Sequence, residues 1–204
     1  LADKTVKNFR ILCLMTVGRA GSKLFHSLLD NHPQVICFPR TLQFENFWWR
    51  VAHRKDDPEY VIDRFIELDP RFFDGRAWAI LNKFDKADLL GEKRDETFHV
   101  DRATFRSIAL EQIGEHEVTR AHLFVVLHTA YHLACGKKLP VNGLILYHIH
   151  GVYFEDQLAA CLDDFPGRTS VVMMTRDPVK SMDSSVKWMD MQLILSCGGQ
   201  LFFT

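Results

Sequence analysis

Residues 10–38 read RILCLMTVGRAGSKLFHSLLDNHPQVICF, and the order of patterns in this stretch decides the fold. Arg10–Val17 is a nearly continuous apolar run, typical of a strand buried on both faces of a parallel sheet. After a glycine turn, residues 22–31 have helical periodicity, and His32-Pro33 ends the helix because proline disfavours helix at the preceding residue. Gln34–Phe38 then reads as a second strand, so the stretch opens a βαβ unit. The apolar face of the helix is expected to hold Leu24, Phe25, Leu28 and Leu29.

The rest of the chain places a helical middle between two sheet-forming parts. Residues 40–140 are predicted to be mostly helical, with helices at Pro58–Leu68, Asp101–Ile113 and Glu117–Cys135. Sheet character returns with a strand at Gly143–Ile149 and a buried strand at Thr169–Thr175, and with helices at Glu155–Asp164 and from Pro178 to about Met191. The fold class expected is α/β: one three-layer domain over residues 1–204, with a central parallel sheet and a helical insertion at about 40–140.

Composition limits the classes of partner. The formal net charge is −1, so no global field attracts nucleic acid or an anionic membrane, and any anion site must be built locally. No apolar stretch is long enough to span a bilayer. The five cysteines are scattered, without CxxC spacing, which indicates buried thiols of a reduced, cytoplasmic protein rather than a disulfide framework.

The glycine turn carries the first candidate site. In open α/β sheets, ligands bind beyond the carboxyl ends of the strands, and a helix N-terminus there attracts anions. Glycines allow close approach of the backbone, an arginine can fork onto phosphate or sulfate oxygens, and a serine and a lysine add a hydroxyl and a charge. A simple βα turn remains the alternative. The stretch is not a Walker A loop, because Ser22 separates Gly21 from Lys23 and no Ser or Thr follows. The candidate residues are Gly18, Arg19, Ala20, Gly21, Ser22 and Lys23.

The second candidate site is the stretch VVMMTRDPVKSMDSS at 171–185. A strand delivers Arg176 at its carboxyl end, and the following helix carries Ser184 eight residues later. A fixed arginine with helix-borne hydroxyls suits a second phosphate group, whereas a capped strand–helix turn is the alternative reading.

Together the two motifs resemble the PAPS-dependent sulfotransferase family, a P-loop-like fold, in its bacterial-type members. GRAGSKLFHSLLDNHPQV resembles the family's 5′-phosphosulfate loop, with Arg19 at its basic position, Gly21 at its glycine and Ser22 at its first hydroxyl. Lys23 departs from the usual second Ser or Thr. TRDPVKSMDSS resembles the 3′-phosphate motif, with Arg176 and Ser184 at the matching spacing. The resemblance covers about 10–38 and 143–190, and members usually continue beyond the 3′ motif.

The resemblance also implies a catalytic base in LILYHIHG at 144–151. His150 falls where members with a catalytic histidine carry it, and His148 falls where they carry a lysine. Alternatively, both histidines are only hydrogen-bonded on one face of a strand. Glu45 is a second candidate base without motif support.

Two further groups of residues could form a binding site. His128 and His132 stand four residues apart on a helix, as zinc ligands can, but no acidic partner follows them, so ordinary helix histidines are favoured. Phe44, Phe47, Trp48 and Trp49 are expected in the core, with the lining of an apolar acceptor pocket as the alternative.

The activity implied is in-line transfer of a sulfuryl group from PAPS to a hydroxyl or amine of a small-molecule, carbohydrate or lipid acceptor, without a metal. Arg19 would stabilise charge in the transition state. The alternatives are a catalytically inactive nucleotide-binding or interaction domain of the same fold and, less favoured, a nucleoside-phosphate kinase.

Overall fold

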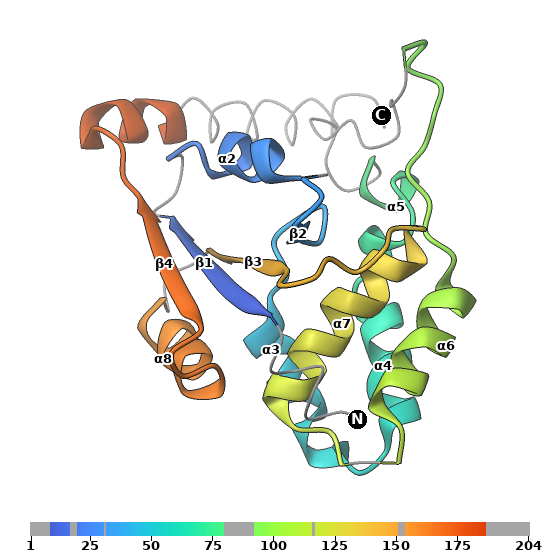
Figure 1. Ribbon diagram of the computed structural model, residues 1–204. Helices are drawn as coiled ribbons and strands as arrows, with labels where there is room; N and C mark the ends of the chain where they lie inside the picture. The colour runs from blue at the N-terminus through green and yellow to red at the C-terminus, as the bar shows by residue number, and fades with distance from the viewer. Residues whose placement is uncertain are drawn as a thin grey trace, which may run out of the picture.

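The structure is a computed structural model that describes residues 9–16, 20–30, 32–79, 92–115, 117–150 and 154–186 (Figure 1). It is a mixed α/β structure with a four-stranded, all-parallel sheet in the order β2-β3-β1-β4. The strands are β1 (Arg10–Thr16), β2 (Val35–Ile36), β3 (Leu144–His150) and β4 (Thr169–Met174). The four strands expected from the sequence are therefore confirmed, although β2 is shorter than expected.

The helices follow the predicted order. The α-helices are α2 (Ser22–Leu29), α3 (Phe44–Val51), α4 (Pro58–Leu68), α5 (Arg76–Ala79), α6 (Arg102–Ile113), α7 (Arg120–Ala134) and α8 (Phe154–Asp164), with short 3-10 helices η1 (Ala52–Arg54) and η2 (Pro70–Phe72). Residues 178–186 are also helical.

Side-chain hydroxyls and carboxylates explain where the middle helices begin. Asp57 caps α4 by accepting a hydrogen bond from the Tyr60 backbone N–H, with Pro58 in the first turn. Asp101 caps α6 in the same way. Thr119 caps α7, so this helix begins three residues later than Glu117, where it was expected. The described residues between β2 and β3 are mostly helical, as expected.

The two faces of the sheet pack against different helices. One face contributes Ile11, Cys13 and Tyr147 to the main core, which also contains side chains of α3, α4, α6, α7 and α8. The other face contributes Leu14 and Leu146 to a smaller core closed by α2. Helices thus cover both faces, the arrangement expected of a three-layer α/β domain.

Two expectations about apolar faces were wrong. β4 was predicted to be a buried strand, but Val171 and Met173 are 43% and 58% exposed, because β4 lies at the edge of the described sheet and α8 does not cover them. On α2, Phe25 and Leu29 pack on the sheet while Leu24 and Leu28 are exposed.

The inward face of α2 explains the second error. It carries the buried polar residues Ser22 and His26 beside Phe25 and Leu29. A pattern based only on apolar residues therefore rotates the helix away from its true orientation.

None of the helices in the described part of the chain is both long and apolar enough for a membrane span.

Candidate functional site

The carboxyl ends of three strands meet at one edge of the sheet. In the parallel register, Thr16 at the end of β1 lies opposite His150 of β3 and Met174 of β4. β1 is followed by α2 on one face of the sheet, and β3 is followed by α8 on the other. Adjacent strands whose connections leave on opposite faces form the crevice in which open α/β sheets bind ligands.

The glycine turn lies at this edge. Gly21 has φ 92°, in the left-handed region that favours glycine, and it is the N-cap of α2 without a side-chain capping bond. Ala20 is half-buried, Ser22 is buried beneath the turn, and Lys23 is exposed. The α2 N-terminus therefore meets one requirement of an anion site, since no side chain of the cap residue occupies it. Gly18 and Arg19 lie outside the described residues.

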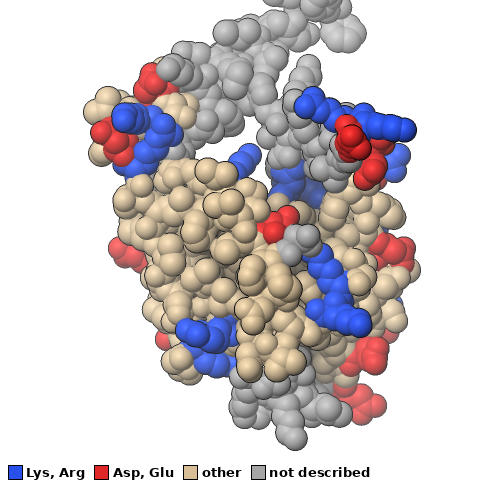
Figure 2. Space-filling model, turned by 45° about the horizontal axis from the view of Figure 1, so that its top comes forward, with Lys and Arg blue, Asp and Glu red and all other residues tan. Residues whose placement is uncertain are grey.

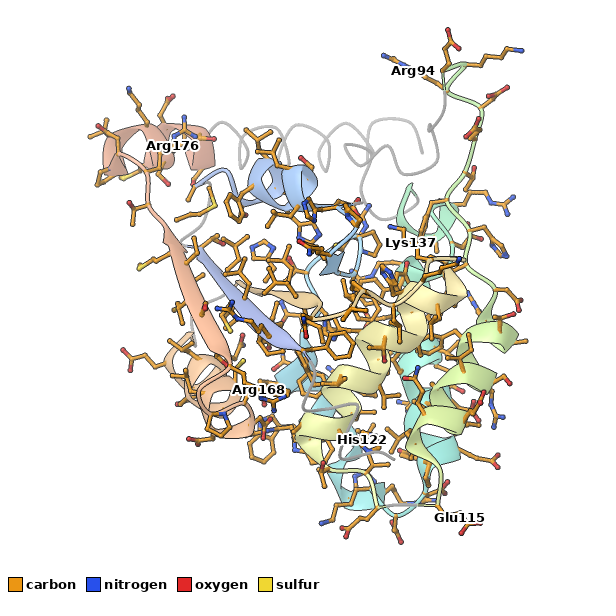
Figure 3. All side chains as sticks on the ribbon, in the orientation of Figure 1. Arg94, Glu115, His122, Lys137, Arg168 and Arg176 are labelled. Carbon is orange, nitrogen blue, oxygen red and sulfur yellow. The ribbon has the colours of Figure 1, made fainter. Side chains whose placement is uncertain are left out.

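The second motif approaches the first. A Cβ atom placed on Gly21 would lie 3.9 Å from the Met174 side chain, two residues before Arg176. Figure 3 shows Arg176 at the start of the 178–186 helix, at the same end of the molecule as α2. Arg176 is exposed and Ser184 is half-buried.

The helix of the second motif begins differently from α2. The Asp177 carboxylate accepts a hydrogen bond from the Lys180 backbone N–H at 3.0 Å, and the Ser181 N–H donates to the Asp177 carbonyl. A carboxylate therefore already caps this helix, so a phosphate bound here must be held by side chains rather than by helix amides.

His148 is buried between two threonine hydroxyls at the same edge. Its Nε2 lies 3.2 Å from Thr16 Oγ1, and its Nδ1 lies 3.0 Å from Thr41 Oγ1. The ring of His26 from α2 is 6.1 Å away, and its own Nε2 bonds the Phe38 carbonyl at 2.9 Å. Both ring nitrogens of His148 have hydroxyl partners. His148 could therefore act as a base only if one of these hydrogen bonds breaks.

His150 belongs to the same strand, two residues further on. Its backbone pairs in register with Thr16, which places it at the carboxyl edge of the sheet. Its side chain lies outside what the structure describes.

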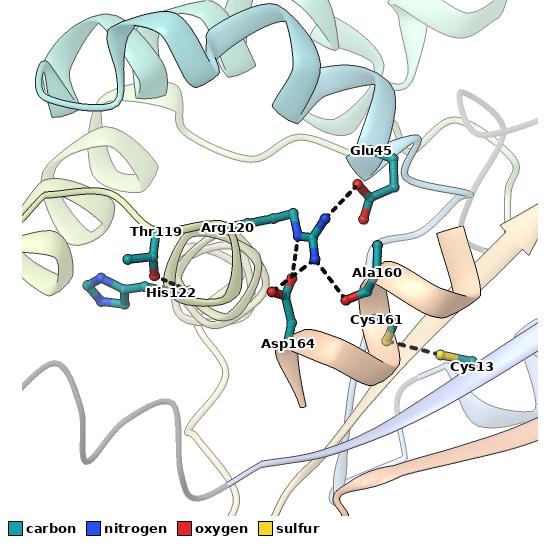
Figure 4. Close-up of polar contacts among 8 residues, drawn as sticks. All are labelled: Cys13, Glu45, Thr119, Arg120, His122, Ala160, Cys161 and Asp164. Carbon is teal, nitrogen blue, oxygen red and sulfur yellow. Dashed lines mark hydrogen bonds and ion pairs between the residues drawn. The ribbon is translucent and has the colours of Figure 1, made fainter. Parts of the chain in front are cut away.

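Glu45 lies below the opposite face of the sheet. Its carboxylate is 3.8 Å from Arg120 Nη1, and Arg120 also bonds Asp164 and the Ala160 carbonyl (Figure 4). Burial raises the pKa of Glu45, partly offset by Arg120. Its charge in turn acts on Tyr147, whose side chain lies on the face opposite to His148. Glu45 is therefore not brought to His148.

The two helix histidines have hydrogen-bond partners within the protein, and most of the aromatic cluster belongs to the core. His128 Nδ1 bonds the Phe124 carbonyl at 2.7 Å, and burial lowers the pKa of His128 to about 4. His132 Nε2 donates to the Lys138 carbonyl. In the aromatic cluster, Phe44 and Phe47 are core residues and Trp48 packs against the main core, whereas Trp49 is 75% exposed.

Figure 2 turns the upper end of the molecule towards the viewer. Charges of both signs gather over the 178–186 helix, and the face below the grey segments is mostly tan, with scattered blue and red side chains.

Sequence reasoning missed Thr16 and Thr41 as hydrogen-bond partners of His148, and His26 as its ring neighbour. Thr16 could have been found as the one polar residue that closes an apolar strand. His26 could have been found as a polar residue four positions after Ser22 on one helix face. Thr41 carried no signal, because it stands in an irregular segment.

Comparison of the chain with protein-family models, with curated proteins and with solved structures found no match.

Proposed function

We propose that this chain binds PAPS and transfers its sulfuryl group to a hydroxyl or amine acceptor. The observation that carries the proposal is the approach of Gly21 to Met174, because it brings the loop before α2 and the strand that leads to Arg176 to one edge of the sheet. A nucleotide with phosphate groups at both its 5′ and 3′ positions needs two such anion sites a short distance apart. We further propose a P-loop-like topology, with β1 between β3 and β4 as the strand that enters the phosphate loop.

The two anion sites divide the nucleotide between them. The α2 N-terminus, with Lys23 and Arg19, would hold the 5′-phosphosulfate, where uncapped amides and cations favour negative charge. Arg176 and Ser184 would hold the 3′-phosphate. The Asp177 cap makes that second site depend on the arginine, because the Asp177 carboxylate already accepts from the Lys180 N–H.

The proposed transfer is a single displacement at sulfur. The acceptor oxygen or nitrogen forms a bond to sulfur while the bond from sulfur to the bridging phosphate oxygen breaks, and 3′,5′-adenosine diphosphate leaves. Arg19 and Lys23 would stabilise the charge that grows on the bridging oxygen. His150 would take the acceptor proton. His148, held by hydrogen bonds to Thr16 and Thr41, would line the site next to His150.

Two other functions compete with this proposal. A catalytically inactive nucleotide-binding domain would use the same two anion sites, and a nucleoside-phosphate kinase would prefer ATP with magnesium. The cytoplasmic setting expected from the thiols also remains a proposal; Cys13, Cys37, Cys135 and Cys161 are free in the structure.

Thermal stabilisation separates these functions in a first step. A ligand that binds only the folded state raises the melting temperature with its concentration. Stabilisation by 3′,5′-adenosine diphosphate but not by ATP with magnesium supports the sulfotransferase site, and the reverse supports the kinase. Turnover of labelled PAPS with carbohydrate, lipid, phenol and peptide acceptors then separates an enzyme from a binding domain. Absence of turnover with every acceptor class, despite nucleotide binding, would favour the inactive domain.

A further inference from the structure

Two cysteine thiols contact each other inside the main core. Neither is a residue of the candidate nucleotide site. Cys13 stands in the middle of β1, and Cys161 stands on α8, 148 positions later in the sequence. Their sulfur atoms are 3.3 Å apart, and Figure 4 shows the two side chains pointing at each other. Cys13 is fully buried and Cys161 is 3% exposed, and both are free thiols.

The contact requires little movement to become a bond. A disulfide has a sulfur–sulfur distance of about 2.05 Å, so the two atoms need to approach by roughly 1.2 Å. The side chains rise from a central strand and from the helix that packs on it, and both belong to one hydrophobic core. Side-chain rotation within that core can supply a movement of this size.

The other described cysteines lack such a neighbour. Cys37 donates a hydrogen bond from its thiol to Asp30 Oδ1 at 3.7 Å, and Cys37 and Cys135 are half-buried. They offer better access to a reagent than the buried pair does, but no sulfur contact of theirs matches the one between Cys13 and Cys161. Cys37 therefore serves as the matched control, because it is more accessible but differently partnered.

We propose that Cys13 and Cys161 are an oxidative modification site, at which a two-electron oxidant joins them as a disulfide within the folded domain. The oxidant is hydrogen peroxide or a small-molecule disulfide such as oxidised glutathione. Two S–H bonds break and one S–S bond forms. The two electrons and two protons reduce peroxide to two molecules of water, or reduce the small disulfide to two thiols.

The bond would tie the central strand to the crossover helix between β3 and β4. Since it closes a loop of nearly three-quarters of the chain, it constrains the unfolded state strongly, and the folded domain becomes more stable. The contact with Cys13 and burial raise the pKa of Cys161, so few thiolates are present at neutral pH and oxidation is slow compared with that of an exposed thiol. The inference does not depend on the proposed function.

The test uses the whole chain under native conditions. Reduced protein is incubated with oxidised glutathione, remaining thiols are alkylated, and the unreduced digest is mapped by mass spectrometry. The expected result is a linked peptide pair containing Cys13 and Cys161, together with a melting temperature raised by about 5 °C or more relative to the reduced protein. Cys37→Ser should keep both results, whereas Cys161→Ala should lose both.

Three results would overturn the proposal: alkylation of both thiols after incubation, glutathione adducts on either cysteine without a linked pair, or a linked pair with an unchanged melting temperature. The wild-type peptide map decides the matter even if Cys161→Ala fails to fold.

Discussion

Lowering the pH from 7 to 4 should destabilise the folded domain through His128 on α7. This ring is fully buried, bonds the Phe124 carbonyl and packs against the rings of Phe38 and Phe124. Burial lowers the pKa of His128 from 6.5 to about 4. Between these two pH values the unfolded chain binds a proton that the folded chain does not bind, so the free energy of unfolding falls as the pH falls.

The size of the effect follows from the two pKa values. Each pKa unit corresponds to about 1.4 kcal/mol, so the loss reaches about 3 kcal/mol at pH 4 and then levels off. That is a large part of the 5–15 kcal/mol by which domains are ordinarily stable. Above pH 6.5 the contribution of His128 does not change with pH.

Urea unfolding at several pH values measures this loss. The wild type should lose about 3 kcal/mol more than His128→Leu between pH 7 and pH 4, because the variant has no imidazole to protonate at this position. Tyr131→Phe, on the same helix, is the control: it removes a hydrogen bond to the Phe72 carbonyl and should lower stability equally at every pH in this range. Equal losses in the wild type and in His128→Leu would refute the reasoning.

Three further outcomes are expected. Arg120→Ala should lower the free energy of unfolding by about 3 kcal/mol in urea titrations, since it leaves two largely buried carboxylates without their cation; a loss below about 1 kcal/mol would show that water replaces the guanidinium. Gly21→Ala should cost about 1–2 kcal/mol through its left-handed backbone rather than through a clash, because the nearest atom is 3.9 Å from the new Cβ; a stability equal to the wild type would mean that the turn readily changes its conformation. His150→Ala should lower the rate of sulfuryl transfer by about 10²–10⁴-fold with nucleotide affinity nearly unchanged, and a dead His148→Ala beside an active His150→Ala would shift the base by two residues.

Much of the fold could be predicted because its signals are local. Asp57 and Asp101 stand directly before helical periodicity, and both cap the helices expected there. The apolar run that begins at Arg10 predicted the start of β1 correctly, since a strand covered on both faces needs apolar residues at nearly every position.

The errors arose where tertiary contacts decide. Leu24 and Leu28 were predicted to lie on the apolar face of the helix, but both are exposed. Ser22 and His26 are buried instead, because a polar cluster occupies that end of β1 and β3. The exposure of Met173 depends on which element lies beside β4, and no local pattern states that. Thr41 reaches His148 across 107 positions of sequence, a separation that no motif spans.

The preference of the chain for a 3′-phosphorylated nucleotide tests the central proposal most directly. Calorimetry should compare 3′,5′-adenosine diphosphate with 5′-adenosine monophosphate on the wild type, on Arg176→Ala and on Arg168→Ala. The two arginines flank opposite ends of β4 (Figure 3), and Arg168 lies over the Phe165 ring, so Arg168→Ala removes the same charge away from the site.

The wild type and Arg168→Ala should both prefer the diphosphate. Arg176→Ala should bind it about tenfold or more weakly, because a hydrogen-bonded charge pair contributes roughly 1.5–3 kcal/mol, and should lose the preference. Failure of the wild type to distinguish the two nucleotides, or unchanged binding by Arg176→Ala, would contradict the proposal.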